Sequence, residues 1–392
     1  MAKKAFENLK FRSTVTLMAL KMNYILIQKD DIKSKNWGSS CAEIGVNLVA
    51  VPGSSAWMPI QLLISCFRLG RPSAVVYRYL NDYPSFFRSF FLKLVSELIT
   101  VTICFLLKIR IIWFCHNVDA ETTQNFPILT GFRRAMFAKF SANIFVMDSL
   151  LLRKAYEVFP MYKNKINYLC FGIDTSVEKK ISVNKTFEER ALMFIENAHA
   201  NSDHNKLKIG FCPGTANAKS NKCIHFDLVK DLILEGEKAG IDIRMIVVGP
   251  ISEYLKCNAP SVLEFINNDS RVLFVDDYIH YDNQIISKYI NFYWRAYSDW
   301  SVGYTMYESC LVEKPILTFN AGFLGLAIPE YNLGAAISSD FSNIKKAFFK
   351  IDNWSYEFAK NFLEEHTWDI AANRLVCAIK EPNQLTNIAK QV

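Results

Sequence analysis

The sequence predicts an α/β protein that consists of two doubly wound, Rossmann-like domains with a cleft between them. The 392 residues are too many for one ordinary hydrophobic core. Runs of consecutive apolar residues alternate with helix-like segments in both halves of the chain, which is typical of parallel strands covered by helices on both faces. The composition, 51% hydrophobic and 14% aromatic, is that of a folded chain with a large buried core.

The first half of the chain contains six apolar runs that we interpret as strands. They lie at 24–28, 46–51, 74–79, 109–115, 143–147 and 165–170. Between them, the spacing of apolar residues predicts helices at about 57–69, 84–107, 130–141 and 149–158. We interpret KDDIKSKNWGSSCAEIG, which follows the first strand, as a loop.

The same alternation restarts in the second half, after a polar stretch at 174–205 that includes a possible helix at 187–199. Strands are expected at 207–211, 243–248, 272–275, 290–294 and 315–319. Helices are expected at about 225–239, 252–258, 282–289, 305–312, 340–350 and 353–380. The resulting domain boundaries are 1–175, a linker at 176–206, a second domain at 207–352, and C-terminal helices at 353–392 that could return to the first domain.

Charge and cysteine usage narrow the classes of function. A net charge of +7 fits a basic soluble enzyme, or a protein drawn to anionic lipid or an anionic substrate. We expect no nucleic-acid partner, because no dense Lys/Arg stripe or zinc-finger spacing occurs. The ten cysteines form no C-x-x-C pair, which favours buried free thiols over a metal site or disulfides. Residues 1–23 lack a convincing cleavage site, so we expect a cytoplasmic chain.

The apolar stretch 92–115 has some of the composition of a membrane span, but it includes charged residues and divides better into a helix end and a buried strand. Before it, RYLNDYPSFFRSFFLK at 78–93 mixes aromatic and basic side chains. This segment forms either a core-facing helix with a basic rim or an interfacial helix that docks on an anionic inner leaflet. In the second case, Arg133, Arg134 and Lys139 would extend the basic surface.

Candidate binding residues gather in YSDWSVGYTMYESCLVEKPILTFN, at 297–320. This stretch predicts a strand end, a turn, a short helix and a second strand at the sheet edge where ligands bind. Glu308, in the first turns of the helix, suits the two hydroxyls of a ribose, or it simply favours the helix dipole. The other ligand-binding candidates lie in the turn before this helix and at its start: Asp299, Ser301, Gly303, Tyr304 and Thr305.

The loop CPGTANAKSNK, after the first strand of the second half, is a candidate phosphate site. Gly214 and Thr215 let backbone approach a ligand, and Lys219 and Lys222 can neutralise phosphate oxygens. The alternative is an ordinary solvated loop. Turns after the next two strands add two candidates, Gly249 and Tyr278.

Taken in order, these features resemble the C-terminal domain of GT-B glycosyltransferases, most of all the family 4 (group 1) enzymes of polysaccharide or lipid-linked glycan synthesis. NAGFLG and PEYNLGAAI resemble the family's Gly-rich donor loop and the strand after it. The match covers most of the second half and extends more weakly into the first. The positions in register are Lys222, Gly249, Ser301, Gly303, Glu308 and KPIL at 314–317.

One position departs from the family pattern. The family's first acidic residue, which serves the donor sugar, would lie eight positions before Glu308, and that position is Trp300. A Trp side chain cannot accept a hydrogen bond from a sugar hydroxyl, and Asp299 beside it is the available substitute. The donor sugar and the choice between retaining and inverting chemistry therefore stay open.

In the first half, the strand RIIWFC runs into HNVDAET and places His116 at a strand end. Related enzymes have a similar strand ending, where the His approaches the donor sugar or the acceptor; the alternative is a His that caps a turn. Asp119 and Glu121 are candidate bases for an inverting mechanism, and His116 could take the same role; Asp119 also suits a turn cap. Gly38 and Ser39 fit the family's Gly-bearing loop near the diphosphate and acceptor.

The resemblance implies a nucleotide-sugar-dependent glycosyltransferase of hexosyltransferase type, acting on a glycan or lipid-linked acceptor in bacterial surface polysaccharide synthesis. It implies no cofactor and no metal, because lysines and a helix start can stabilise the leaving diphosphate. The enzyme would be cytoplasmic or peripheral on the inner face of the plasma membrane. The alternatives are a nucleotide-sugar epimerase or pyruvyltransferase on the same architecture, and a non-catalytic glycosyltransferase-like subunit.

Overall fold

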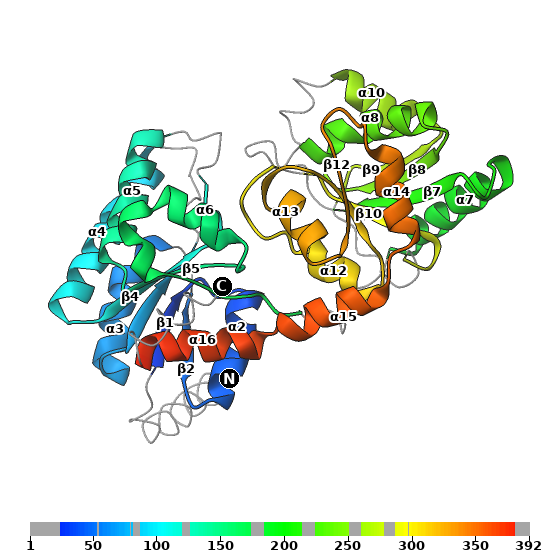
Figure 1. Cartoon of the computed structure of the whole chain (residues 1–392). Coiled ribbons are helices and arrows are strands. Elements are labelled where there is room, and N and C mark those ends of the chain that lie inside the picture. Colours follow the sequence, from blue (N-terminus) through cyan, green and yellow to red (C-terminus); the bar gives the residue numbers. More distant parts are fainter. Residues whose placement is uncertain are drawn as a thin grey trace, which may run out of the picture. The chain divides into compact units, whose positions relative to one another are not determined.

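In the computed structural model, the chain forms two units, each built around a six-stranded parallel sheet (Figure 1). The first unit comprises Met1–His116, Gln124–Phe171 and Thr367–Val392, and the second comprises Asn117–Thr123 and Gly172–His366. The structure describes residues 24–52, 55–78, 80, 87–119, 126–173, 184–213, 224–250, 260–277, 287–296 and 298–380.

The first sheet has the strand order β2-β1-β3-β4-β5-β6. Its strands are β1 (Tyr24–Gln28), β2 (Asn47–Val51), β3 (Ala74–Tyr77), β4 (Arg110–Cys115), β5 (Asn143–Val146) and β6 (Ile166–Tyr168). The inner strands β1, β3 and β5 are buried at every position, as expected for consecutive apolar residues covered on both faces. Ile25 pairs with Leu48 on one side and with Ala74 on the other, so the chain reverses its winding direction beside β1.

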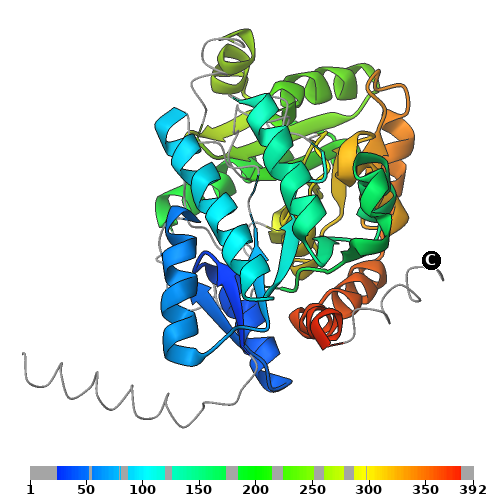
Figure 2. The same ribbon diagram turned by 90° about the vertical axis from the view of Figure 1, so that its left-hand side faces the viewer.

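This reversal distributes the helices over the two faces of the first sheet, because crossover connections are right-handed. The helices are α2 (Ile32–Glu43), α3 (Met58–Leu69), α4 (Phe87–Leu106), α5 (Pro127–Phe140), α6 (Leu151–Val158) and α16 (Trp368–Lys380). Short 3₁₀ turns lie at η1 (Ser55–Trp57) and η2 (Pro160–Lys165). Helices α3, α4 and α5 lie side by side on one face (Figure 2). On the other face α16 packs on α2, and the rings of Trp37 and Trp368 are 5.3 Å apart.

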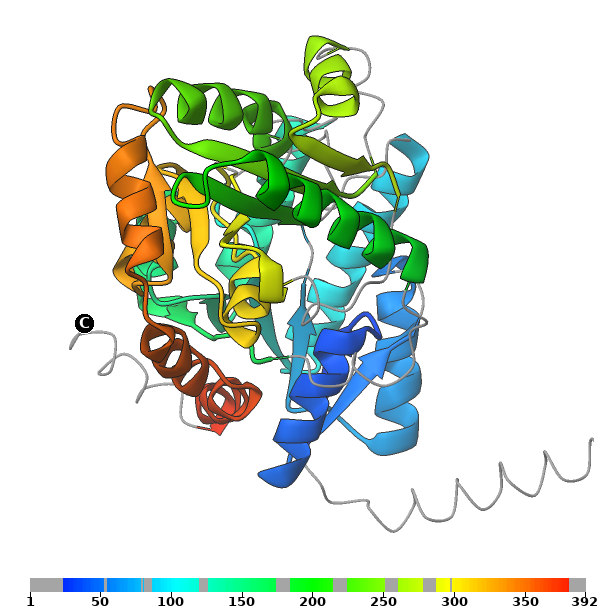
Figure 3. The same cartoon turned by 90° about the vertical axis from the view of Figure 1, so that its right-hand side faces the viewer.

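The second sheet has the order β12-β11-β10-β7-β8-β9 and reverses between β7 and β10. Its strands are β7 (Leu207–Pro213), β8 (Asp242–Val248), β9 (Val272–Val275), β10 (Phe292–Trp294), β11 (Ile316–Phe319) and β12 (Gly334–Ile337). The helices are α7 (Lys185–Asn201), α8 (Ile224–Lys238), α10 (Pro260–Asn268), α12 (Thr305–Leu311), α13 (Gly322–Glu330), α14 (Ile344–Asp352) and α15 (Tyr356–Glu365). Figure 3 shows α7 and α8 beside β7 and β8, which they contact.

Several expectations from the sequence need correction. The segment after β1 is not a loop but helix α2, whose N-cap Asp31 accepts from the backbone of Ser34 in a capping box. NAGFLG, expected to be a loop, mostly forms the start of α13. Helix α10 was not predicted from the sequence. The C-terminal helical segment divides between the two units, since α15 belongs to the second and α16 to the first. The predicted helix at 252–258 lies outside the described residues.

The predicted basic surface of the first unit is also different. Arg78 and Arg133 are fully buried, and Arg134 is nearly so. They cannot present charge to a lipid surface, whereas Lys139 is exposed. The prediction of buried free thiols is confirmed for the part of the chain that the structure describes: its eight cysteines are free and six are buried. Burial raises the pKa of Cys212 to about 12.

Gly334 gives a direct test of the register between β11 and β12. It has φ +151°, and a Cβ built on it would overlap the carbonyl oxygen of its partner Ile316. We expect Gly334→Ala to destabilise the protein by about 2 kcal/mol or more, because both the backbone conformation and the space exclude a side chain. Thermal unfolding followed by circular dichroism measures the loss.

The matched control is Gly131→Ala on α5, where nothing lies within 4 Å of an added Cβ. This change should stabilise the helix by roughly 0.5–1 kcal/mol. Equal effects of the two substitutions would contradict the strand pairing described here.

Candidate functional site

The reversal point of the second sheet brings charged groups to the carboxyl ends of its central strands. Arg295 directly follows β10, and its Nη1 donates to the carbonyl oxygen of Pro213, the last residue of β7, at 2.5 Å. Its backbone N–H donates to Leu317 of β11. In open α/β sheets, ligands bind in the crevice beyond the strand ends at this reversal. Arg295 therefore stands at the position where this unit is expected to bind a ligand.

The positive charge of Arg295 acts on the carboxyl group of Glu308. Glu308 lies in the first turn of α12 and is half-buried. Burial raises the pKa of its carboxyl, and the positive charge of Arg295 partly opposes that rise. Burial and the negative charge of Glu308 together raise the pKa of Tyr293, whose buried hydroxyl bonds to none of the described residues. A carboxylate, a guanidinium and a phenol therefore influence one another electrostatically around β10 and its carboxyl end.

The turn before α12 is held in place by several contacts. The Oγ of Ser301 donates to Asp299 Oδ2 at 2.7 Å, and both side chains are buried. The backbone N–H of Val118 donates to the carbonyl oxygen of Trp300 at 3.0 Å, and Asn117 forms a bridge with Ser301. The Asp299 carboxylate thus shapes the turn, and its position one residue before Trp300 does not by itself provide an exposed acid.

Gly322 fixes the same turn from the other side. Its φ is +60°, and an added Cβ would overlap the backbone of Ser298 and lie 2.6 Å from the carbonyl oxygen of Asp299. The next residue, Phe323, donates its N–H to that oxygen at 2.9 Å. Close backbone packing therefore explains the first glycine of NAGFLG, Gly322.

The other residues predicted to bind the nucleotide-sugar donor lie, where the structure describes them, at two places. Gly303, Tyr304 and Thr305 lie at the turn and start of α12, where the Tyr304 hydroxyl donates to Gly172 at 3.2 Å. Gly249 directly follows β8 with φ +146°, a conformation that favours glycine, and donates its N–H to the carbonyl oxygen of Val275 in β9. The following predicted residues lie outside the described part of the chain and stay predictions: Gly214, Thr215, Lys219, Lys222, Tyr278 and Glu121.

The first sheet has an arginine at the equivalent reversal point. Arg78 follows β3, and its backbone N–H donates to the Gln28 side chain at the end of β1, at 2.7 Å. The fully buried guanidinium donates from Nη1 to Asp31 Oδ1 at 2.9 Å and from Nε to His116 Nε2 at 3.4 Å. Since arginine only donates, Nε2 of His116 is the acceptor and the ring proton lies on Nδ1. His116 is therefore placed to donate from Nδ1 rather than to accept a proton at Nε2.

Aromatic rings surround this polar group. The His116 ring stacks on Phe171 with 5.7 Å between centroids and 10° between planes. Lys33 Nζ lies 4.1 Å from the same Phe171 ring, and the Arg78 guanidinium lies 5.2 Å from the Trp37 ring. Sequence reasoning missed Arg78 and Asp31 as site residues. The available signal was an arginine placed directly after a fully apolar strand.

Three other first-half predictions have mixed outcomes. Gly38 and Ser39 lie inside α2 rather than in a loop, and a Cβ on Gly38 would meet its nearest atoms at 3.8 Å, in ordinary contact. The predicted loop location was therefore wrong, and their proposed closeness to a ligand is not tested. Asp119 is half-buried and belongs to the second unit.

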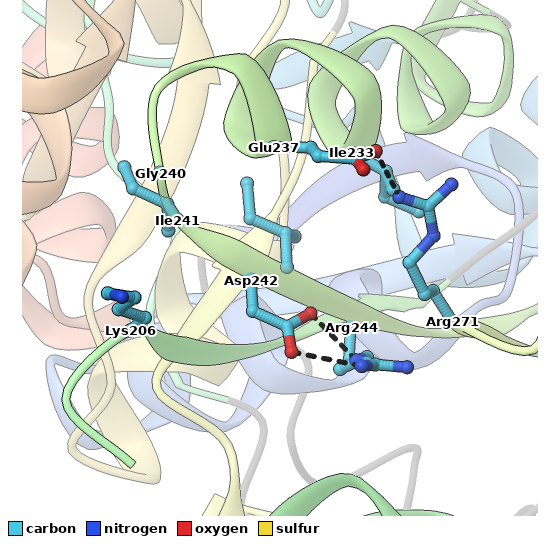
Figure 4. Close-up of a pocket in the computed structure, with 9 residues that line it drawn as sticks. Lys206, Ile233, Glu237, Gly240, Ile241, Asp242, Arg244 and Arg271 are labelled. Carbon is cyan, nitrogen blue, oxygen red and sulfur yellow. Dashed lines mark hydrogen bonds and ion pairs between the residues drawn. The ribbon is translucent and has the colours of Figure 1, made fainter. Parts of the chain in front are cut away.

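A cavity of about 330 Å³ opens at the opposite edge of the second sheet (Figure 4). It lies where β8 and β9 begin, and charged side chains line it. These pair with one another: Arg244 with Asp242, and Arg271 with Glu237 and Asp269. Ligand sites of open parallel sheets lie beyond the carboxyl ends of strands, so we do not assign function to this cavity.

No protein-family model and no curated protein matches the sequence. Solved structures, however, match nearly the whole chain. A sucrose-phosphate synthase from Thermosynechococcus elongatus is 11% identical, covers 92% of this chain and 99% of its own, and gives a TM-score of 0.62. The catalytic domain of starch synthase IV from Arabidopsis thaliana, bound to ADP and acarbose, is 10% identical, with 95% and 100% covered and a TM-score of 0.59.

A UDP-GlcNAc 2-epimerase from Methanocaldococcus jannaschii is also similar, at 12% identity, with 90% and 98% covered and a TM-score of 0.50. At these identities the likeness establishes the fold. The chain has the GT-B fold, with two Rossmann-like units, as the sequence predicted.

The raised pKa of Glu308 predicts a pH-dependent stability. In the folded state its pKa lies above the ordinary value of 4.5, so the folded protein binds this proton more tightly than the unfolded chain does. The protein therefore loses stability as pH rises from about 4.5 through the folded-state pKa. Glu308→Gln should therefore be more stable than wild type at neutral pH, and this advantage should disappear below about pH 4.5.

Thermal midpoints of both proteins across this pH range measure the difference. Glu330→Gln, at an exposed carboxylate of the same unit, is the control and should show no comparable crossover. A wild-type protein that is the more stable one at neutral pH would show that the Arg295 charge outweighs burial.

Proposed function

We propose that this protein is a nucleotide-sugar-dependent glycosyltransferase of hexosyltransferase type. The observation that carries the proposal is the position of Arg295 at the reversal point of a Rossmann-like sheet, where its charge acts on the Glu308 carboxyl, in a chain of GT-B fold. A carboxylate can accept hydrogen bonds from two vicinal ribose hydroxyls, and a guanidinium can bind phosphate. Together they suit a nucleoside diphosphate better than an uncharged ligand.

The donor would bind to the second unit. Glu308 would hold the ribose, while Lys222, Ser301 and Thr305 would hold the diphosphate. Arg295 would add positive charge as the bond between the anomeric carbon and the phosphate oxygen breaks. Basic side chains and backbone N–H groups would carry this stabilisation without a metal or another cofactor. α12 has only seven residues, so we give its dipole a minor part.

The acceptor would bind to the first unit near His116. With Arg78 bonded to its Nε2, His116 would donate from Nδ1 to a sugar or acceptor oxygen and orient it. In an inverting reaction, Asp119 or Glu121 would take the acceptor proton; in a retaining reaction, the departing phosphate would take it. The acceptor that we propose is a glycan or lipid-linked glycan of bacterial surface polysaccharide synthesis, which fits a cytoplasmic enzyme.

A second candidate is a nucleotide-sugar epimerase, since a UDP-GlcNAc 2-epimerase has a similar fold. It would bind the same donor but need no acceptor. A pyruvyltransferase on this architecture would transfer a pyruvyl group instead, so it would not use a nucleotide-sugar donor. A third candidate, a non-catalytic subunit, is favoured by Trp300 at the position of the family's acid. Nucleotide binding together with acceptor-dependent release of nucleotide separates all of these from the proposed function.

The experiment measures the binding of UDP, GDP, ADP and CMP by thermal shift and by calorimetry. We expect selective stabilisation by one nucleotide, and at least about tenfold weaker binding in Glu308→Ala, because the ribose loses a charged acceptor. Glu330→Ala, at an exposed carboxylate, is the matched control and should bind as wild type does. If none of the four nucleotides binds, the proposed function is overturned.

A further inference from the structure

Three neighbouring helices of the first unit turn large apolar side chains outward. Helices α3, α4 and α5 lie side by side in Figure 2. Phe67 on α3 is 93% exposed, Phe105 on α4 is 73% exposed, and Ile128 on α5 is 86% exposed. Leu92, Leu106 and Phe132 are exposed beside them. We call the surface formed by these six side chains the outer apolar face.

Helix α4 carries large apolar side chains on both its buried and its exposed side, and several of its polar residues are buried. Ser96, Glu97 and Thr100 are buried, while Leu92 and Phe105 face outward. A helix at a protein–water boundary normally buries its apolar stripe and exposes its polar one. Here Phe90 and Leu94 are buried as that rule expects, but large apolar side chains also lie on the exposed side, which suits an apolar partner or medium.

A buried ion pair fixes the orientation of α4 and α5. Glu97 accepts from Nε and Nη2 of Arg133, each at 2.6 Å, and both side chains are fully buried. Breaking such a pair by rotating either helix would leave an uncompensated buried charge. The exposure of Phe132 on α5 and Leu92 on α4 is therefore held by the core, so these residues do not turn inward at little cost.

The charges around the outer apolar face have one sign. Glu97 is the one acidic residue within α3, α4 and α5, and it is buried. Arg68, Arg88 and Lys139 are exposed on the same three helices. Apolar side chains rimmed by basic ones, with no exposed acid on these helices, match an interface between acyl chains and anionic headgroups.

By length and composition α4 could also cross a membrane, and among the described residues it is the one helix that could. Its internal contacts speak against a span, since it covers the sheet, contacts α3, and bonds through Glu97 to α5. We propose that the outer apolar face lies in the plane of an anionic bilayer surface and docks the first unit there. This proposal does not rest on the proposed sugar transfer.

The test is co-sedimentation of the full chain with vesicles of phosphatidylcholine alone or mixed with phosphatidylglycerol. Wild type should bind the mixed vesicles. The triple variant Phe67→Ser/Phe105→Ser/Ile128→Ser should bind at least about tenfold more weakly, because three large side chains no longer enter the bilayer. All three positions are more than 70% exposed, and an unchanged circular dichroism spectrum and nucleotide binding would verify the fold.

Matched controls lie on the second unit. Met193→Ser/Phe349→Ser removes apolar side chains that are 62% and 68% exposed, and it should leave vesicle binding unchanged. For charge, Arg68→Gln/Arg88→Gln/Lys139→Gln should weaken binding to mixed vesicles and reduce its salt dependence. Lys345→Gln/Lys346→Gln/Lys350→Gln, at exposed lysines of α14, should have little effect.

Three results would overturn the proposal. Equal binding by wild type and the apolar triple variant would show that another surface binds lipid. A wild-type dimer that dissociates in the triple variant, with no vesicle binding, would identify the face as a contact between copies of this chain. Release from vesicles by detergent but not by high pH would indicate a membrane span.

Discussion

Both sheets depend on a reversal of winding direction between two central strands, and an arginine bonds across each reversal. Arg78 reaches the Gln28 side chain at the end of β1, and Arg295 reaches the Pro213 carbonyl at the end of β7. At these points two loops leave in opposite directions, so the strand ends are not covered by a connecting helix. At β7 the guanidinium of Arg295 satisfies the strand-end carbonyl, whereas at β1 the backbone N–H of Arg78 makes the bond and its buried guanidinium binds Asp31 and His116.

The same topology explains the outer apolar face. From β2 to β6 the first sheet grows in one direction, so right-handed crossovers place α3, α4 and α5 on one face together. The Glu97–Arg133 pair then fixes which sides of α4 and α5 face outward. The opposite face instead receives α2 and α16, which pack on each other. One sheet thus separates a polar strand-end site from the outer apolar face.

Much of the fold could be predicted from sequence, because parallel strands buried on both faces leave continuous apolar runs; β1 and β9 were predicted with the observed ends. Helix α2 was missed because Lys, Ser and Gly interrupt any apolar stripe, although Asp31 and Ser34 carry a capping signature. The burial of Arg78 and Arg133 was not predictable, since the partners of their guanidinium groups lie 36 to 47 residues away in sequence. Glu308 was found through its motif, whereas Arg295, whose charge acts on the Glu308 carboxyl, was found through the structure alone.

The central claim is that Glu308 holds a ribose. The most direct measurement is the affinity of wild type and Glu308→Ala for the preferred nucleoside diphosphate and for its 2′-deoxy form. Wild type should favour the ribonucleotide by roughly tenfold or more, and this preference should nearly vanish in Glu308→Ala, because the lost hydroxyl and the lost carboxylate belong to the same interaction. An equal preference for the ribonucleotide in both proteins would contradict the assignment.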